Sequence, residues 1–315
     1  MTDPAAAAPN APLVIEPSQA DGGLSPGSAT CATWLEALAQ HGAILFRGFS
    51  VATAEDFDAW IAAFGLESFT YEASLSNAVR RNRTPRVFTA NEAPAHVEIF
   101  LHHEMAQTPL FPRRLFFCCE QAPNSGGATP LRRSDQLLNE LESALPDLIN
   151  ACRKHGVRYT HVMPAETDTA SGQGRSWRDT LSVSTREEAE RRLGGLGYDW
   201  IWQDANSLRV VTPVLPAIRR APSGQEVFFN QLIAAFCGWQ DRRNEAKRSV
   251  QYGDGSEIHA EQLEEATRIA YEGVFDLQWQ EGDVALIDNY LVMHGRRPFE
   301  GSRSVLASLA GVDSN

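Results

Sequence analysis

The stretch Phe100-Leu101-His102-His103-Glu104-Met105 contains the sequence His-x-Glu among apolar residues, and this pattern predicts a short buried β-strand. Side chains at positions i and i+2 of a strand point to the same face, with their α-carbons roughly 6.6 Å apart. An imidazole and a carboxylate can therefore converge on one cation. In a regular strand the converging pair is His102 with Glu104, and His103 points to the opposite face. The residues alone still leave His103 open as the ligand.

A second segment, residues 282–299, complements this pair from far along the chain. It contains a long apolar run followed by His294, and Arg303 comes shortly afterwards. Two histidines and one carboxylate on one face of a metal are typical of non-haem Fe(II) oxygenases, and they leave positions open for a cosubstrate and O2. A His-x-Glu sequence alone also fits a partly buried histidine beside a surface glutamate. The second segment favours the metal site.

Composition narrows the classes of partner and compartment. The chain has 315 residues, is 43% hydrophobic and 22% charged, and carries a formal net charge of −12. The two fractions are ordinary for a soluble globular protein, and the negative charge does not favour nucleic acid or an anionic membrane surface as a partner. The five cysteines lack regular spacing, so we expect buried thiols in a reducing compartment rather than disulfides. Neither a signal peptide nor a membrane-spanning run is evident, and we expect a cytoplasmic protein.

The chain divides into a short leading segment and one domain. Residues 1–29 are rich in Ala, Pro, Gly and Ser and predict a mobile N-terminal segment, in which residues 13–15 can add an edge strand. Residues 30–315 show no internal repeat and no linker, and they predict a single domain. Within it, residues 31–40 predict a helix that ends at Gly42, and Thr53 predicts the N-cap of a second helix.

Several segments, in order along the chain, resemble the taurine dioxygenase/clavaminate synthase-like family of Fe(II)- and 2-oxoglutarate-dependent oxygenases. Within that family the chain is similar to the branch of clavaminate synthase-like proteins and the syringomycin-type aspartyl hydroxylase. The matching segments lie at residues 87–92, 102–107, 115–130, 174–177, 229–230, 238–244, 282–299 and 303–309. They span nearly the whole chain, and their order is more specific than any one motif.

The fold that we expect is mainly β with flanking helices. Many strands are predicted, with helices at the edges and in insertions, and this count fits a double-stranded β-helix, which is a cupin-like jelly roll. Strands that are distant in sequence lie side by side in such a fold. Their inward faces can therefore hold metal ligands rigidly between the two sheets.

The resemblance implies a set of residues for the cofactors. It implies that His102, Glu104 and His294 bind Fe(II), that 2-oxoglutarate chelates the iron, and that O2 is the oxidant. It also implies that Arg303 pairs with the distal carboxylate of 2-oxoglutarate and that Thr129 donates a hydrogen bond to a carboxylate. A guanidinium suits this role because its planar fork binds a carboxylate through two hydrogen bonds. The rivals of Arg303 are Arg296 and Arg297.

The substrate side of the site rests on fewer signals. The resemblance places Asn230 and the loops around residues 72–84 and 164–180 near the open face of the iron. Arg175, beside Trp177, could clamp a substrate carboxylate, or it could brace its own loop against an acidic neighbour. Arg80, Arg81 and Arg83 form a cluster that fits a solvated loop face better than a device for steering an anionic substrate.

The function that we expect is oxygenation of a small molecule. The resemblance implies hydroxylation of an unactivated C–H bond in an amino acid or related carboxylate, free or tethered to a carrier protein, in secondary metabolism. Related halogenases replace the carboxylate ligand with a small residue, so Glu104 favours oxygenation. Desaturation or cyclisation with the same cofactors, and a jelly roll that binds a metal or small molecule without turnover, are the alternatives. A homo-oligomer is compatible with the sequence.

Overall fold

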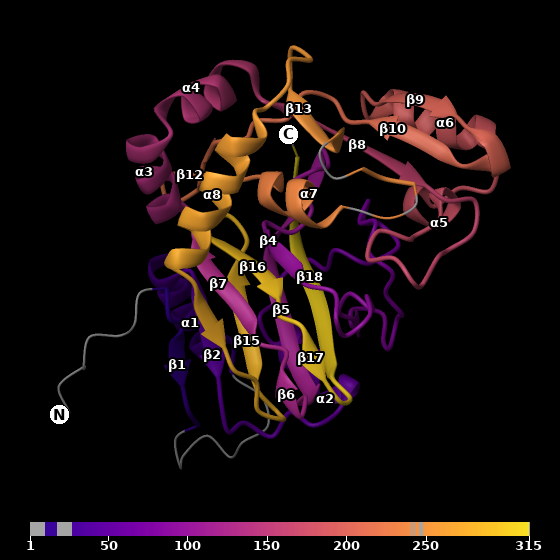
Figure 1. Cartoon of the computed structure of the whole chain (residues 1–315). Coiled ribbons are helices and arrows are strands. Elements are labelled where there is room, and N and C mark those ends of the chain that lie inside the picture. The colour runs from indigo at the N-terminus through magenta and orange to yellow at the C-terminus, as the bar shows by residue number, and fades with distance from the viewer. Residues whose placement is uncertain (1–9, 18–26, 240, 242, 246–247, 315) are drawn as a thin grey trace.

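The computed structural model describes residues 10–17, 27–239, 241, 243–245 and 248–314. Two β-sheets face each other in it and form the double-stranded β-helix that we predicted (Figure 1). The larger sheet has the strand order β1 (Leu13–Ile15), β2 (Ala43–Phe46), β15 (Val284–Asp288), β5 (Leu110–Gln121), β18 (Ser304–Ser314) and β3 (Phe88–Thr89). The smaller sheet has the order β14 (Phe275–Leu277), β7 (Thr129–Arg133), β16 (Val292–Arg296) and β4 (Ile99–His102).

Strand β5 separates two hydrophobic clusters. Its residues Leu115, Phe117 and Cys119 belong to the cluster between the sheets, whereas Phe116 and Cys118 belong to the cluster on the outer face. This follows from the strand period of two residues. The neighbouring Cys118 and Cys119 therefore face opposite ways, and all five cysteines are free thiols.

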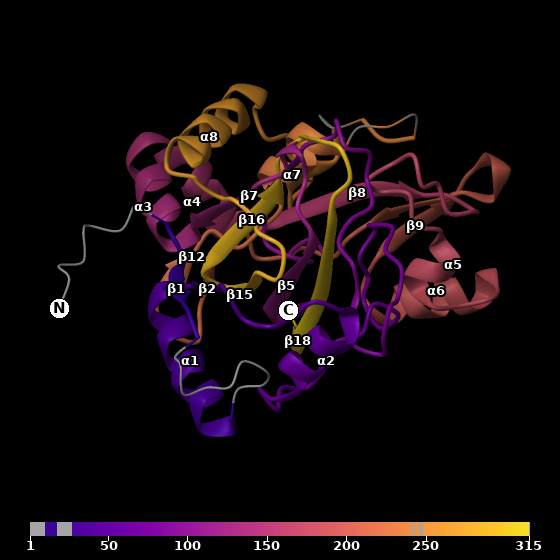
Figure 2. The same cartoon turned by 90° about the horizontal axis from the view of Figure 1, so that it is seen from below.

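Two helices cover the outer face of the larger sheet, as Figure 2 shows from below. They are α1 (Ser28–His41) and α2 (Ala54–Ala62). Gly42 ends α1 with a φ of 78°, and Thr53 begins α2 as the predicted N-cap, in a capping box with Asp56. The predicted edge strand at residues 13–15 is confirmed as β1. Residues 1–9 and 18–26 of the predicted mobile segment lie outside the described residues.

A third sheet and most of the remaining helices lie at one end of the sandwich (Figure 1). This sheet has the order β13 (Val250–Tyr252), β8 (Val157–Met163), β10 (Leu208–Val211) and β9 (Asp199–Trp202). The helices there are α3 (Ser134–Ala144), α4 (Pro146–His155), α5 (Trp177–Leu181), α6 (Arg186–Gly195), α7 (Leu232–Gly238) and α8 (Ala260–Glu272). The short elements are β6 (Ser125–Gly126), η1 (Asp204–Asn206), β11 (Arg219–Arg220), β12 (Glu226–Val227) and β17 (Phe299–Glu300).

None of the helices in the described part of the chain has the length and apolar character needed to cross a membrane. The prediction of a single domain over residues 30–315 stays a prediction.

Candidate active site

The His-x-Glu segment turns earlier than its sequence pattern predicts. We expected a strand through Met105, but β4 ends at His102 and the chain turns at residues 104–107. Met105 has a positive φ of 58°, which an extended strand cannot contain. Asn289 holds this turn, because its amide accepts a hydrogen bond from the Glu104 backbone N–H at 2.8 Å and donates one to the Glu104 carbonyl at 3.0 Å.

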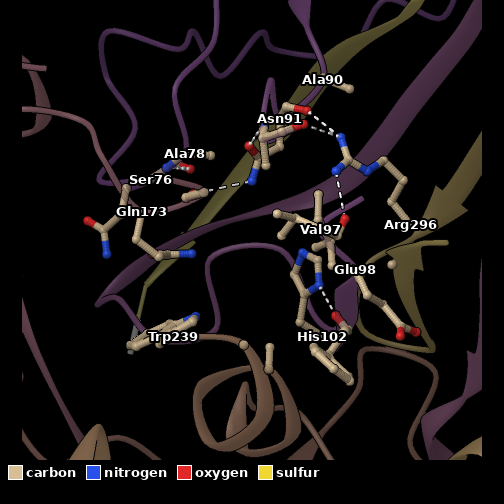
Figure 3. A pocket seen from close by; sticks show the side chains of 18 of the residues that line it. Ser76, Ala78, Ala90, Asn91, Val97, Glu98, His102, Gln173, Trp239 and Arg296 are labelled. Carbon is tan, nitrogen blue, oxygen red and sulfur yellow. Dashed lines mark hydrogen bonds between the residues drawn. The ribbon is translucent and has the colours of Figure 1, made fainter. Parts of the chain in front are cut away.

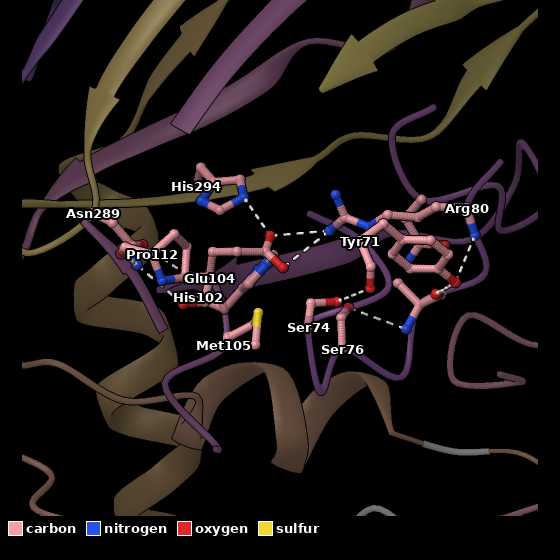
Figure 4. A network of polar contacts seen from close by, with 12 residues as sticks. Tyr71, Ser74, Ser76, Arg80, His102, Glu104, Met105, Pro112, Asn289 and His294 are labelled. Carbon is pink, nitrogen blue, oxygen red and sulfur yellow. Dashed lines mark hydrogen bonds and ion pairs between the residues drawn. The ribbon is translucent and has the colours of Figure 1, made fainter. Parts of the chain in front are cut away.

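The turn nevertheless brings three side chains together. Strand β16 pairs antiparallel with β4 and sets His294 directly opposite His102. Among the described residues, His102, Glu104 and His294 form a cluster in which the candidate ligand atoms lie within 4.8 Å of one another. The Glu104 atom Oε2 lies 4.0 Å from His102 Nε2 and 3.7 Å from His294 Nε2 (Figure 4).

The contacts of His102 favour a neutral imidazole with its lone pair turned toward the cluster. Its Nδ1 lies 2.8 Å from the Phe100 carbonyl oxygen, so Nδ1 carries the proton and Nε2 faces Glu104. Burial, together with the nearby His294, lowers the pKa of His102 to about 4. The ring is therefore unprotonated at neutral pH, as a metal ligand must be.

His103 is directed away from this cluster. Its Nδ1 contacts the carbonyl oxygen of Asn289, and its ring lies 4.7 Å from the ring of Phe229. The residue is completely buried, and burial lowers its pKa to about 3. Its contacts are those of a core residue. The geometry therefore selects His102 over His103 as the partner of Glu104.

Arg80 is part of the site, which the sequence pattern did not indicate. Its Nη2 lies 3.0 and 3.1 Å from the two carboxylate oxygens of Glu104, in a buried ion pair (Figure 4). Burial alone would raise the pKa of Glu104, but the charge of Arg80 and the two histidines hold that pKa far below its usual range. We predicted that all three arginines of this cluster lie on a solvated loop face. The prediction is confirmed for Arg81 and Arg83, which pair with surface glutamates, and it is wrong for Arg80.

Two imidazoles and one ionised carboxylate match the donor set of a non-haem Fe(II) site. His102, Glu104 and His294 all line one cavity of about 190 Å³, which has room for small molecules. Nδ1 of His294 is buried without a hydrogen-bond partner among the described residues. No hydrogen bond at Nδ1 within those residues therefore holds the ring in an orientation that would prevent metal binding. The residues present therefore fit the metal.

Thr129 and Arg303, the residues predicted to bind 2-oxoglutarate, line the same cavity. The Thr129 hydroxyl accepts a hydrogen bond from Trp279 Nε1 at 2.9 Å, so its own proton is free to be donated. Arg303 donates from Nε to the Gly127 carbonyl at 3.1 Å, and within the described residues its two terminal nitrogens have no partner. Burial and the neighbouring Arg296 lower the pKa of Arg303 to about 10, so it stays charged at neutral pH.

The two alternative arginines, Arg296 and Arg297, already have hydrogen-bond or ion-pair partners within the protein. Arg296 donates to the backbone carbonyls of residues 91, 93, 94 and 97 and thereby fixes that loop (Figure 3). Arg297 forms ion pairs with Glu98 and Asp276. In the described part of the chain, Arg303 is therefore the one of the three that presents an open guanidinium fork to the cavity.

None of the three residues predicted to contact the substrate lines the cavity. Arg175 is buried, and its guanidinium donates to the backbone carbonyls of Tyr71, Ser74 and Ser76. It thus braces a neighbouring loop through main-chain oxygens, and the idea of a carboxylate clamp is wrong.

The other two are also structural. Trp177 donates from Nε1 to the Asn206 carbonyl, and Asn230 donates to the Ala217 carbonyl and accepts from the backbone N–H of Leu232. Both residues are 1% exposed, and their polar atoms are used within the core. The family resemblance placed these residues near the site, but it could not give the direction of their side chains.

The comparisons with known proteins agree with this geometry. The sequence model of the family described as "Taurine catabolism dioxygenase TauD, TfdA family" matches residues 15–309. A clavaminate synthase-like protein of Arabidopsis thaliana is 39% identical over 273 residues, which cover 86% of this chain and 82% of that protein. The dapdiamide synthesis protein DdaC of Enterobacter agglomerans is 29% identical over 291 residues, which cover 87% of this chain and 83% of that protein. The crystal structure of PvcB from Pseudomonas aeruginosa has a TM-score of 0.57 at 20% identity, and the match covers 96% of this chain and 86% of that chain.

Proposed function

Because this chain belongs to the TauD/TfdA family of 2-oxoglutarate-dependent dioxygenases, we propose that it hydroxylates an unactivated C–H bond of an amino acid or related small carboxylate. Its metal is Fe(II) and its cosubstrate is 2-oxoglutarate. The observation that carries the proposal is the buried cluster of His102, Glu104 and His294, which share one cavity with Thr129 and Arg303.

Each of these residues has a role in the proposal. His102, Glu104 and His294 hold Fe(II), and the bound metal with 2-oxoglutarate supplies the activation of O2. Arg303 pairs with the distal carboxylate of 2-oxoglutarate, because a free guanidinium fork binds a carboxylate through two charged hydrogen bonds. Thr129 donates its free hydroxyl proton to a carboxylate oxygen and so orients the cosubstrate.

Two further observations support oxygenation within natural-product biosynthesis. Glu104 occupies a ligand position, so no place is left there for a halide. One relative that matches most of this chain is named for dapdiamide synthesis, and the segments noted above resemble the branch of the syringomycin-type aspartyl hydroxylase. In the proposal, the substrate is free or tethered to a carrier protein.

The test is a succinate assay with Fe(II), 2-oxoglutarate and O2 against free and carrier-tethered amino acids, with product masses as the second readout. The proposal expects succinate formation that a substrate stimulates and a product heavier by one oxygen atom. A product lighter by two hydrogen atoms would instead indicate desaturation or cyclisation. Binding without any succinate would indicate a jelly roll that does not turn over.

A further inference from the structure

Three amide oxygens in the cavity lack a hydrogen-bond donor among the described residues: Asn77 Oδ1, Gln107 Oε1 and Gln173 Oε1. Asn77 is 2% exposed and Gln107 is 5% exposed, so bulk solvent barely reaches them. Both Oδ1 and Nδ2 of Asn77 lack hydrogen-bond partners. Exchanging the two atoms by turning the amide over would therefore leave the side chain equally unpaired. Buried polar atoms are nearly always paired, so three such oxygens in one cavity suit a ligand that carries hydrogen-bond donors.

Arg80 adds donors to the same cavity. Its Nε and Nη1 are buried without an acceptor in the described part of the chain, whereas Nη2 is bound to Glu104. The side chain is 6% exposed. A guanidinium carries five N–H donors and no acceptor, so the group opposite these nitrogens must bring lone pairs.

In the proposed loaded site, Arg80 shares the single negative charge of Glu104 with the metal. Bound Fe(II) and Glu104 together carry one positive charge. The two carboxylates of 2-oxoglutarate with Arg303 carry one negative charge, and the two groups cancel. Nε and Nη1 of Arg80 still need an acceptor, and an anionic group of the substrate can supply it, because a buried charge without a full set of partners is costly.

The other carboxylates of the cavity do not supply that acceptor. Glu98 is paired with Arg297, and Asp241 is paired with Arg243. Glu104 is engaged by the metal in the loaded enzyme, as proposed above. An anionic group of the substrate is therefore what Arg80 fits.

Resting on the proposed function, we infer that Asn77, Arg80, Gln107 and Gln173 form a subsite for the ammonium and carboxylate groups of a free amino acid. The three amide oxygens are acceptors for the N–H donors of a primary ammonium group. Arg80 and Nδ2 of Asn77 bind the carboxylate. A carrier-tethered thioester has lost its α-carboxylate, so a subsite that binds the α-carboxylate selects the free acid.

Arg175 is a positioning residue for this subsite. Its guanidinium holds the carbonyls of Ser74 and Ser76, and its backbone N–H donates to the carbonyl of Asn77 at 3.1 Å. The guanidinium also lies 3.9 Å from the centre of the Tyr71 ring. These contacts fix the loop that carries Asn77, so Arg175 acts on the substrate through this loop without touching it.

The test measures binding to the full chain loaded with Fe(II) and 2-oxoglutarate in the absence of O2. Calorimetry with a panel of free L-amino acids identifies the best ligand, and its N-acetyl and methyl-ester derivatives are then titrated. We expect each derivative to bind at least about tenfold more weakly, because each loses charged hydrogen bonds. This measurement needs no variant and tests both halves of the subsite.

Variants assign the two halves. Gln107→Leu should weaken binding of the free amino acid by about tenfold and should leave the N-acetyl derivative unchanged, because that derivative has already lost the ammonium. Asn77→Ala should weaken binding of the free amino acid more strongly. Gln136→Leu and Asn139→Ala change the same residue types on the exposed face of α3 and serve as controls.

Equal affinities for the free acid and both derivatives would overturn the inference, as would unchanged binding in both cavity variants. Stimulation of succinate formation only by carrier-tethered substrates would also overturn it while leaving the proposed function intact. Absence of succinate formation with every substrate would instead count against the proposed function itself.

Discussion

Arg80 Nη2 lies 3.0 Å from Glu104 Oε1 and 3.1 Å from Oε2, and both side chains are almost completely buried. The pair places the only carboxylate of the metal cluster against a fixed positive charge. A metal ion at this cluster would become a second counter-charge for Glu104. The energetic role of Arg80 should therefore depend on whether the metal is bound.

The first prediction concerns Arg80→Leu. In the metal-free protein this change leaves Glu104 as a buried carboxylate without its partner, which typically costs about 3–5 kcal/mol. Bound metal replaces part of the lost attraction, so addition of Mn(II) should raise the melting temperature of Arg80→Leu more than that of the wild type. Arg81→Leu, whose side chain is 75% exposed, is the matched control. An identical loss of stability with and without metal would show that Arg80 and the metal do not share Glu104.

The second prediction separates the neighbouring histidines. His102→Ala should abolish retention of iron and leave a folded protein, because it removes one of the three ligands. His103→Ala should retain iron but lose roughly 3 kcal/mol of stability, because the ring is packed in the core against Phe229. Metal analysis after reconstitution and thermal unfolding measure the two effects. Loss of iron from His103→Ala with retention in His102→Ala would reverse the assignment.

The third prediction concerns the cosubstrate. Arg303→Gln should raise the KM for 2-oxoglutarate by about 10- to 100-fold, since a hydrogen bond to a charged group contributes about 1.5–3 kcal/mol. Thr129→Val should have a smaller effect of the same kind, because it removes one neutral donor. Arg297→Gln is the control, as its ion pairs face Glu98 and Asp276. A larger effect in Arg297→Gln than in Arg303→Gln would assign the distal carboxylate of 2-oxoglutarate to Arg297.

The fourth prediction concerns stability at acidic pH. His161 is buried, both of its ring nitrogens lack partners among the described residues, and burial lowers its pKa from 6.5 to about 4. As the pH falls, His161 takes up a proton at a higher pH in the unfolded chain than in the folded protein. The free energy of unfolding should therefore fall as pH drops from about 6.5 to about 4. His161 should account for up to about 3 kcal/mol of that fall.

His161→Phe should flatten this part of the profile. Chemical denaturation of the wild type and the variant at several pH values between 4 and 7 measures the difference. His102 and His103 have lowered pKa values as well, so the variant should keep a residual slope. Identical profiles for the two proteins would mean that His161 does not carry the proton linkage.

The parts of this site that sequence predicts are those fixed by residue type and order. His102, Glu104 and His294 were found because a metal requires those side chains, although the strand geometry that we used to pair the first two was wrong. The turn held by Asn289 brings Glu104 to the metal cluster by another route. Residue chemistry was therefore a better guide here than local conformation.

What sequence did not predict is where arginines point. Arg80 and Arg175 lie in irregular segments, where no periodicity assigns a side chain to a face. Arg175 was expected at the cavity and is used by main-chain carbonyls, whereas Arg80 was expected in solvent and lies against Glu104. The partner of a long, flexible cation is decided by tertiary contacts that no local pattern encodes.

The last prediction tests Arg175 as a loop brace. Arg175→Gln removes the donors that hold the carbonyls of Tyr71, Ser74 and Ser76, so the loop should open more often. Hydrogen exchange of the backbone amides at residues 71–78 should speed up several-fold, and the KM for the amino-acid substrate should rise. Iron retention and the KM for 2-oxoglutarate should stay near the wild-type values, because neither cofactor site uses this loop's carbonyls.

Arg178→Gln is a suitable control, since Arg178 stacks on Trp177 and its Nη1 donates to the Ala165 carbonyl at 3.2 Å, which lies outside residues 71–78. Arg175→Lys should behave like Arg175→Gln, because a single ammonium cannot reproduce the planar fork that reaches three carbonyls and lies over Tyr71. If Arg175→Gln raised the KM for substrate while hydrogen exchange at residues 71–78 stayed unchanged, Arg175 would act directly on the substrate. The hypothesis that Arg175 acts by holding the loop at residues 71–78 would then be wrong.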